Sequence, residues 1–173
     1  SQIFIPDNFR YFDESDLFDD DGRPLPLDYL AFWDVAAGKT SRADYNAILT
    51  VARNRRTGVI YIVDAWAKKC PAHVALDFAV QKIKEFGHNV FAVETIGVGH
   101  DMYRQLRERL AKERIYGTKL KPISHYSANK EKRIEALEPL CESGFLRFMK
   151  HHSLLLEQLE QFPSGQHDDL ADA

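Results

Sequence analysis

Asp34 and Glu94 have the residue type and the position in the sequence that suggest chemistry. Asp34 interrupts the apolar segment DYLAFWDVA (28–36), and Glu94 ends the apolar run VFAVE (90–94). Alternation along an extended chain puts each acid on the same face as the apolar residue two positions before it. A carboxylate that faces a core costs free energy unless it is paired, hydrogen-bonded or bound to a metal. Taken singly, Asp34 is also explained by a bond to a backbone amide, and Glu94 by a helix cap.

Further acids gather at the end of the sequence, in the predicted final helix GQHDDLADA (165–173). Neighbouring strands would place Asp34 and Glu94 at one edge of a sheet, and a helix packed across that edge would bring Asp169 to them. Three like charges repel unless divalent cations neutralise them. Oxygen ligands without cysteine favour Mg²⁺ or Mn²⁺ over zinc. Two such ions about 4 Å apart activate water and stabilise the leaving oxygen of a phosphodiester, which predicts metal-dependent phosphoryl chemistry.

The elements that must position these acids follow from the hydrophobic pattern. Strands are predicted at 28–36, 44–54 and 58–66, with the short RRTG segment (55–58) forming an antiparallel hairpin. The pattern then alternates between helix and strand. Helices are predicted over 73–86, around Tyr103, Leu106 and Leu110, through Ile134, Leu137 and Leu140 after a cap at Ser127 or Asn129, from about 152 to Pro163, and over 165–173; strands are predicted at 88–94, 119–125 and 145–148.

These elements predict an α/β domain with a central mixed sheet, an antiparallel second strand and helices on both faces. A chain of 173 residues is long enough for about one domain. Residues 1–27 have no sustained periodicity and end in Gly22, Pro24 and Pro26. We therefore expect a linker or N-terminal arm outside the core, followed by the domain proper at 28–173.

Composition and charge exclude several classes of protein. With 45% hydrophobic and 28% charged residues, and no apolar run of about 20 residues, the sequence predicts a soluble protein rather than a membrane protein. Cys70 and Cys141 match no disulfide framework or zinc motif, which favours a reducing compartment. The net charge of −3 is unevenly distributed, because residues 1–30 carry −6 and residues 119–133 carry +4. The basic segment is either a solvated surface or a phosphate-binding one.

Gly38-Lys39-Thr40 looks like the end of a nucleotide-binding P-loop, but its context differs. That loop requires a glycine five positions before Gly38, where Trp33 stands, and it must open a helix rather than precede a strand. We therefore expect no ATP hydrolysis by this chain.

Four segments together resemble the nuclease domain of the large terminase subunit of tailed double-stranded DNA bacteriophages. They occur in the order found in that family, and they span most of residues 28–173. The segments are WDVAAGKTSRADYNAI (33–48), FAVETIGVG (91–99), SANKEKRIEAL (127–137) and HDDLADA (167–173). The resemblance implies a ribonuclease H-like fold, two-metal cleavage of packaged concatemeric DNA, and an ATPase motor domain upstream in the same polypeptide.

The resemblance also assigns roles to individual residues. Asp34, Glu94 and Asp169 would be the catalytic, metal-binding acids, and Asp172 would be a further metal ligand. Asp168 is the weaker alternative to Asp169, because only Asp169 shares a helix face with Asp172 through i, i+3 spacing. Lys130 and Arg133 would contact DNA phosphates near the site. His167 would orient the attacking water or the scissile phosphate, or else cap the helix.

The resemblance leaves open three functional interpretations. We expect a magnesium- or manganese-dependent endonuclease that cuts viral double-stranded DNA in the cytoplasm of the infected bacterial host. The second interpretation is a Holliday-junction resolvase or a transposase-like nuclease of the same fold. The third is a non-catalytic module that docks on a packaging partner such as the portal or the small terminase subunit. Because the chain carries no ATPase domain, we expect it to resemble an isolated or excised nuclease domain, whose acidic first 30 residues would be the remains of the interdomain linker.

Overall fold

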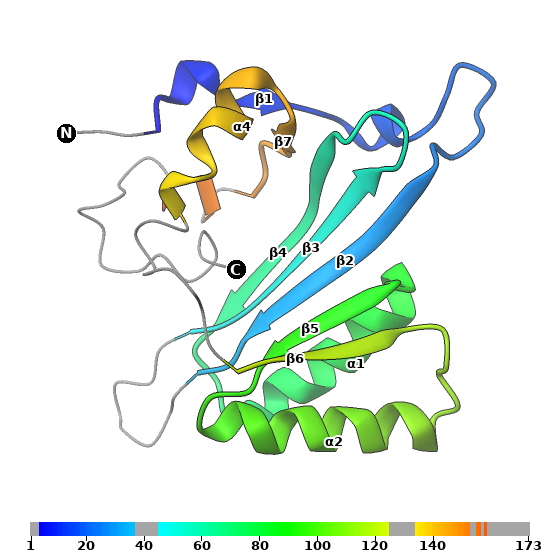
Figure 1. The fold of residues 1–173 in the computed structure, drawn as a ribbon, viewed down its shortest axis with the longest axis vertical. Helices are drawn as coiled ribbons and strands as arrows, with labels where there is room; N and C mark the ends of the chain where they lie inside the picture. The colour runs from blue at the N-terminus through cyan, green and yellow to red at the C-terminus, as the bar shows by residue number, and fades with distance from the viewer. Residues whose placement is uncertain (1–3, 37–44, 125–133, 153–154, 157, 159–173) are drawn as a thin grey trace.

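The computed structural model describes residues 4–36, 45–124, 134–152, 155–156 and 158, and it contains a seven-stranded mixed sheet flanked by helices (Figure 1). The strand order is β1-β7-β4-β3-β2-β5-β6. The elements are η1 (Pro6–Asn8), β1 (Arg10–Tyr11), η2 (Glu14–Leu17), β2 (Leu27–Asp34), β3 (Asn46–Asn54), β4 (Ile60–Lys68), α1 (Ala72–Phe86), β5 (Val90–Glu94), α2 (Val98–Lys112), β6 (Lys119–Ile123), α4 (Glu138–Ser143) and β7 (Leu146–Phe148). The predicted fold class, a mixed sheet with an antiparallel second strand, is confirmed.

The strands β2, β3 and β4 form the antiparallel centre of the sheet. The predicted hairpin between β3 and β4 is confirmed. Its turn is held by Asn54, whose Oδ1 accepts hydrogen bonds from the backbone N–H groups of Arg56 and Thr57. Parallel strands then extend the sheet on both sides, with β5 and β6 beside β2 and with β7 beside β4.

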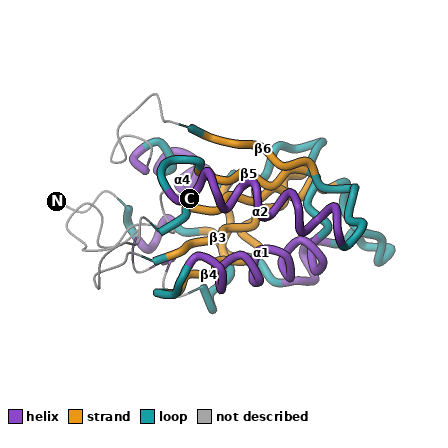
Figure 2. Tube along the Cα trace, turned by 90° about the horizontal axis from the view of Figure 1, so that it is seen from below, coloured by secondary structure: helices purple, strands orange, loops and turns teal. Residues whose placement is uncertain are grey.

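Helices α1 and α2 lie side by side against one face of the sheet (Figures 1 and 2). Leu76, Ala79, Val80 and Ile83 of α1 are buried there, and Gly87 ends α1 in the left-handed conformation, at φ 59°. Trp33 and Phe91 are fully buried between the sheet and these helices. This face contains the main core.

On the opposite face, the part of the sheet formed by β3 and β4 packs against α4, the N-terminal segment and residues of β7. Phe4 and Phe9 are buried here with Phe148, and β1 pairs in parallel with β7. The expectation that the first residues lie outside the core is therefore wrong, because their phenylalanines complete this second core. The division into an arm (1–27) and a domain (28–173) stays a prediction.

Parts of the predicted C-terminal region lie outside the described residues. These parts include the caps at Ser127 or Asn129, most of the helix from about 152 and the whole of the helix at 165–173. Ile134 is fully buried, and α4 begins after it, at Glu138. Of the helices that the structure describes, none is long and apolar enough to cross a membrane.

Candidate functional site

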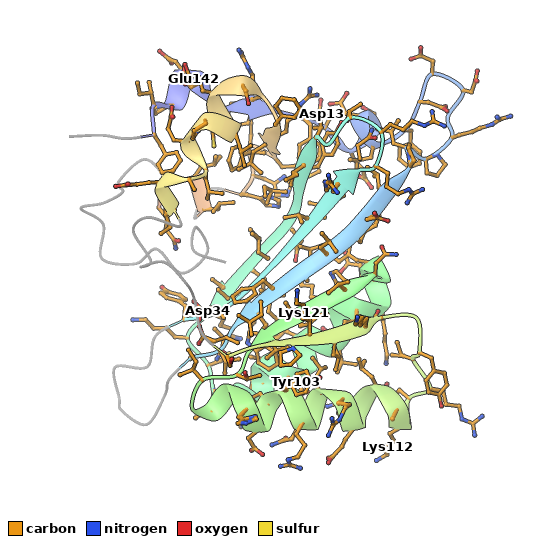
Figure 3. All side chains as sticks on the ribbon, viewed as in Figure 1. Asp13, Asp34, Tyr103, Lys112, Lys121 and Glu142 are labelled. Carbon is orange, nitrogen blue, oxygen red and sulfur yellow. The ribbon has the colours of Figure 1, made fainter. Side chains whose placement is uncertain are left out.

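Asp34 and Glu94 stand at the carboxyl ends of two neighbouring parallel strands. The register pairs Phe32 with Ala92 and Trp33 with Val93, so the next step along β2 and β5 sets Asp34 beside Glu94. Neighbouring strands lie about 4.8 Å apart, which puts the two carboxylates within reach of one ion. The expectation that these two acids meet at one sheet edge is confirmed. Figure 3 shows Asp34 at this end of β2.

Asn89 fixes this register at the other end of the two strands. Its backbone N–H donates to the Tyr29 carbonyl oxygen at 2.8 Å, and its Oδ1 accepts from the Tyr29 N–H at 2.9 Å. A slip of one residue would turn Glu94 to the opposite face of the sheet. The side-chain amide of Asn89 therefore contributes to the alignment of the two acids.

The two acids point away from the main core. Trp33 and Val93, the residues just before them, are fully buried under α1 and α2. Successive side chains of a strand alternate between faces, so Asp34 and Glu94 share the other face. Both residues are half-buried. The carboxylates of Asp34 and Glu94 therefore lie outside the main core, although the strands that carry them are anchored in it by Trp33 and Val93.

Asn46 is a positioning residue that the sequence reasoning missed. Its side chain is fully buried, and its Oδ1 accepts hydrogen bonds from Trp33 Nε1 at 3.1 Å and from the Ala36 N–H at 3.0 Å. Its Nδ2 donates to the Cys70 carbonyl oxygen at 2.9 Å. Asn46 thus holds the chain on both sides of Asp34. The signal was a polar residue at the start of the apolar strand 46–52, the same signal that identified Asp34.

Two glycines explain why a helix can begin directly after Glu94. Gly97 has φ 59° and ψ −122°, a conformation that essentially only glycine adopts. A Cβ on Gly99 would lie 1.8 Å from the Glu94 carbonyl oxygen, which no side chain can tolerate. The GVG sequence therefore lets α2 press against the end of β5, and this contact fixes the backbone of Glu94.

The other residues predicted for the site belong to segments outside the described residues. Asp168, Asp169, Asp172 and His167 lie outside the described residues, as do Lys130 and Arg133. Within the described part of the chain, no group of three or more His, Cys, Asp or Glu residues could hold a metal ion. Of the four predicted metal ligands, the structure therefore describes Asp34 and Glu94.

The pair suits hard divalent cations. It offers carboxylate oxygens, and neither Cys70 nor Cys141 belongs to a ligand cluster among the described residues. Carboxylate oxygens are the ligands preferred by Mg²⁺ and Mn²⁺, whereas structural zinc sites rely on thiolate and imidazole. Bringing two carboxylates together is electrostatically unfavourable, and a divalent cation would reverse the sign of that interaction.

A second polar cluster lies inside the main core. Asp64 on β4 forms an ion pair with Lys82 on α1, with Nζ and Oδ2 2.8 Å apart but outside hydrogen-bond geometry. His88 is fully buried nearby, and its Nε2 lies 2.9 Å from Thr50 Oγ1. Burial lowers the pKa of His88 to about 4, although the Asp64 charge opposes the shift. These residues join β3 and β4 to α1 and to the segment after it, and we assign them to stability.

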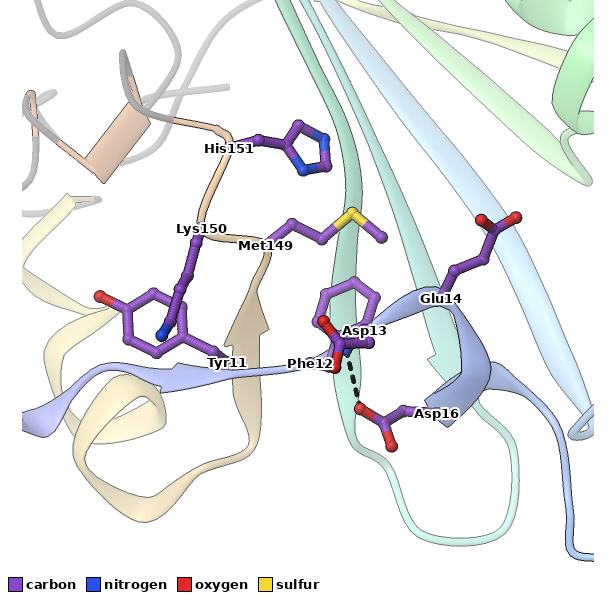
Figure 4. Close-up of a pocket in the computed structure, with 8 residues that line it drawn as sticks. All are labelled: Tyr11, Phe12, Asp13, Glu14, Asp16, Met149, Lys150 and His151. Carbon is purple, nitrogen blue, oxygen red and sulfur yellow. Dashed lines mark hydrogen bonds between the residues drawn. The ribbon is translucent and has the colours of Figure 1, made fainter.

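A surface cavity of about 590 Å³ (Figure 4) lies beside Asp13, at the opposite end of the sheet from Asp34 (Figure 3). The N-terminal segment and the residues after β7 line it. In its wall, the Asp13 N–H donates to Asp16 Oδ2 at 2.8 Å, and Lys150 Nζ lies 5.4 Å from the centre of the Tyr11 ring. The cavity contains neither of the two carboxylates, so size alone does not identify the candidate site.

Similar folds occur in solved structures of viral terminases. The nuclease domain of human cytomegalovirus terminase, soaked with manganese, has a TM-score of 0.65 at 13% identity, covering 98% of this chain and 91% of that chain. A mutant nuclease domain of the large terminase subunit of bacterial virus Sf6, with manganese, has a TM-score of 0.65 at 13% identity, covering 100% and 96%. The large terminase nuclease domain of Thermus phage P74-26 has a TM-score of 0.61 at 17% identity, covering 99% and 91%. These likenesses show that the chain has the fold of terminase nuclease domains.

A comparison with curated proteins found no match. The model of one protein family, described as the terminase RNaseH-like domain, matches residues 31–173. The match begins within β2, before Asp34, and spans every later element of the sheet. The matched region also includes the final acids that the structure does not describe. Together with the fold and the paired carboxylates, this match shows that the chain belongs to the terminase RNaseH-like domain family.

Proposed function

We propose that this chain is a metal-dependent endonuclease that cuts concatemeric viral double-stranded DNA during genome packaging. The observation that carries the proposal is the parallel register of β2 and β5, which brings Asp34 and Glu94 to one edge and one face of the sheet. Membership of the terminase family and the manganese in two similar nuclease structures support it.

Asp34, Glu94 and Asp169 would hold two Mg²⁺ or Mn²⁺ ions, with Asp172 as a further ligand. When bound, such a pair of ions activates a water and stabilises the leaving oxygen of a phosphodiester. The chain's own contribution is to fix its ligands on rigid elements. Asn46 and Trp33 hold the end of β2, while Gly97 and Gly99 let α2 hold the end of β5.

Lys130 and Arg133 would contact phosphates beside the site, since basic side chains supply most of the sequence-independent affinity for DNA. We also infer that the chain works beside an ATPase domain of the same subunit, because the Sf6 relative is a nuclease domain of a large terminase subunit. The small terminase subunit and the portal would be further partners. The proposed setting is the cytoplasm of an infected bacterial host.

The test is cleavage of supercoiled plasmid by the purified chain with magnesium, with manganese and with a chelator. We expect nicking and linearisation that require a divalent cation and that disappear in Asp34→Asn, which removes one metal-binding charge while keeping the side-chain shape. Asp20→Asn, in the exposed N-terminal turn, removes the same charge far from the site and is the matched control, which should cut like the unmodified chain.

Full cleavage by folded Asp34→Asn would overturn the site assignment. Absence of cleavage with either metal, in a chain whose manganese binding is measurable, would favour the non-catalytic docking module instead. Selective cutting of four-way junctions over plasmid would favour the resolvase interpretation.

A further inference from the structure

The face of the sheet that carries Asp34 and Glu94 also carries two lysines. In the register of β6 with β5, Lys121 stands opposite Ala92 and Lys119 opposite Val90, while Ile123 stands opposite Glu94. Aligned residues of parallel strands point to the same face, so both lysines share the face of the two acids. Leu120, which lies between them, packs instead into the core beneath α2.

These lysines form a line that leads to the carboxylates. Residues two apart on a strand are separated by about 7 Å. Lys121 therefore lies about 7 Å, and Lys119 about 14 Å, before Ile123 at the carboxyl end of β6. Both residues are exposed, and within the described part of the chain neither forms an ion pair. Figure 3 labels Lys121 on β6 and Asp34 at the end of β2.

The neighbourhood of the lysines suits a polyanion. Ala92, between Lys121 and the strand β2, is buried, and Val90 and Leu30 are half-buried, so the floor of this face is uncharged. Two carboxylates at this end of the sheet repel a phosphodiester, and the nearer lysine, Lys121, lies about a Debye length from Glu94 and offsets part of that repulsion. Lys84, by contrast, lies in the helical layer and is paired with Glu113 at 2.5 Å.

The edge position of β6 does not favour an added protein strand. The Lys119 N–H donates to the Asn89 carbonyl oxygen, and the Ile123 carbonyl oxygen accepts from the Thr95 N–H, so the backbone polar groups of Lys119 and Ile123 point toward β5. The backbone polar groups of Leu120 and Pro122 therefore point away from the sheet, and Pro122 has no N–H to donate. A proline at this position interrupts the ladder that a peptide would need. The lysine side chains of β6, rather than its backbone, are therefore the groups available to bind a partner.

We propose that Lys119 and Lys121 bind backbone phosphates of the DNA, forming a two-residue track along β6 that guides the duplex to Asp34 and Glu94. The proposal rests on the proposed nuclease function, whose substrate path it defines. Because lysine contacts with phosphate carry no sequence information, the track would act on any DNA sequence.

The test is binding of a fluorescein-labelled DNA duplex by the full chain, followed by fluorescence anisotropy over a series of NaCl concentrations with EDTA. Each lost phosphate contact lowers the slope of log Kobs against log salt by about one. We expect Lys119→Ala with Lys121→Ala to lower the slope by about two, and Lys119→Arg with Lys121→Arg to retain it. The matched control, Lys84→Ala with Lys112→Ala in the helical layer, removes the same charge and should leave the slope unchanged.

An unchanged slope in the β6 double variant, or an equal loss in the control, would overturn the track. Plasmid cleavage, measured in parallel, separates the proposed lysine track from the proposed nuclease function. A reduced slope in a chain that cuts no DNA would retain the track and reject the nuclease. Normal cutting with an unchanged slope would retain the nuclease and reject the track.

Discussion

Asp64 and Asp34 lie in the same sheet, but one has a lysine beside it and the other has a second acid beside it. Asp64 lies in the middle of β4, where its carboxylate is 24% exposed and Lys82 stands 2.8 Å away. Asp34 lies at the end of β2, where the neighbouring position on β5 is a second carboxylate. The first arrangement compensates a charge within the core. The second one places two like charges side by side, an arrangement that a bound divalent cation would stabilise.

The comparison teaches that a buried acid is not by itself a sign of function. What distinguishes the two positions is the partner and the location on the strand. Asp64 meets a lysine from α1, whereas Asp34 and Glu94 come from two parallel strands whose carboxyl ends share an edge. In open α/β sheets, ligands bind beyond the carboxyl ends of the strands, which is where the like-charged pair lies.

The largest effect on stability is expected at the compensated acid. Asp64→Asn should lower the free energy of unfolding by about 3 kcal/mol, because it leaves the partly buried Lys82 without its carboxylate. Asp34→Asn should leave that free energy unchanged or slightly raised, because it removes repulsion. Urea denaturation of both variants measures the difference.

A double variant controls this result. Asp64→Asn combined with Lys82→Met removes both charges and should recover most of the lost stability. Equal destabilisation by Asp34→Asn and Asp64→Asn would abolish the distinction between the two acids.

The next effect is a dependence of stability on pH that originates in the core cluster. Burial lowers the pKa of His88 to about 4 in the folded chain, whereas an unfolded histidine titrates near 6.5. Between these values the unfolded chain binds more protons, so the free energy of unfolding falls as pH falls from 6.5 to 4 and is fully retained above 6.5. The loss should reach about 3 kcal/mol at pH 4.

Denaturation midpoints of the unmodified chain and of His88→Gln, measured from pH 7 to pH 4, check this expectation. The variant should have a shallower acid loss. His152, whose pKa burial also lowers, remains in both chains and supplies the residual slope. Identical slopes in the two chains would show that His88 is not the titrating group.

The smallest effect concerns Asn46, which links the core to the candidate site. Asn46→Ala leaves the Trp33 Nε1–H and the Ala36 N–H without their acceptor, so we expect a loss of about 2 kcal/mol. Cleavage should fall, but less than in Asp34→Asn, since both carboxylates remain. Asn46→Asp keeps the acceptor but places a buried carboxylate oxygen against the Cys70 carbonyl oxygen, so it should also destabilise the chain. An effect of Asn46→Ala on stability alone would show that Asn46 does not position Asp34.

Local patterns in the sequence predicted much of the fold. Apolar runs between turn residues predicted the antiparallel strands β2, β3 and β4, and the 3.6-residue period with Gly87 predicted α1 and its end. Asp34 and Glu94 could be brought together because each ends an apolar strand and parallel neighbours share an edge. Their roles in catalysis stay predictions.

Long-range pairing is what the sequence could not predict. The two-residue strand β1 has no periodicity, and its partner β7 lies more than 130 residues away in sequence, so the buried phenylalanines of the N-terminal segment looked like part of a linker. Asp64, Lys82 and His88 meet only because α1 packs across β4. Asn46 and the Gly99 contact likewise depend on distances between elements, which spacing along the chain does not contain.

The central claim is that Asp34 and Glu94 together hold a divalent cation. The most direct test is a crystal of the chain soaked in manganese, with anomalous scattering used to locate the metal. The account predicts a manganese peak coordinated by carboxylate oxygens of both Asp34 and Glu94. Manganese bound elsewhere on the chain, with no peak at this sheet edge, would contradict it.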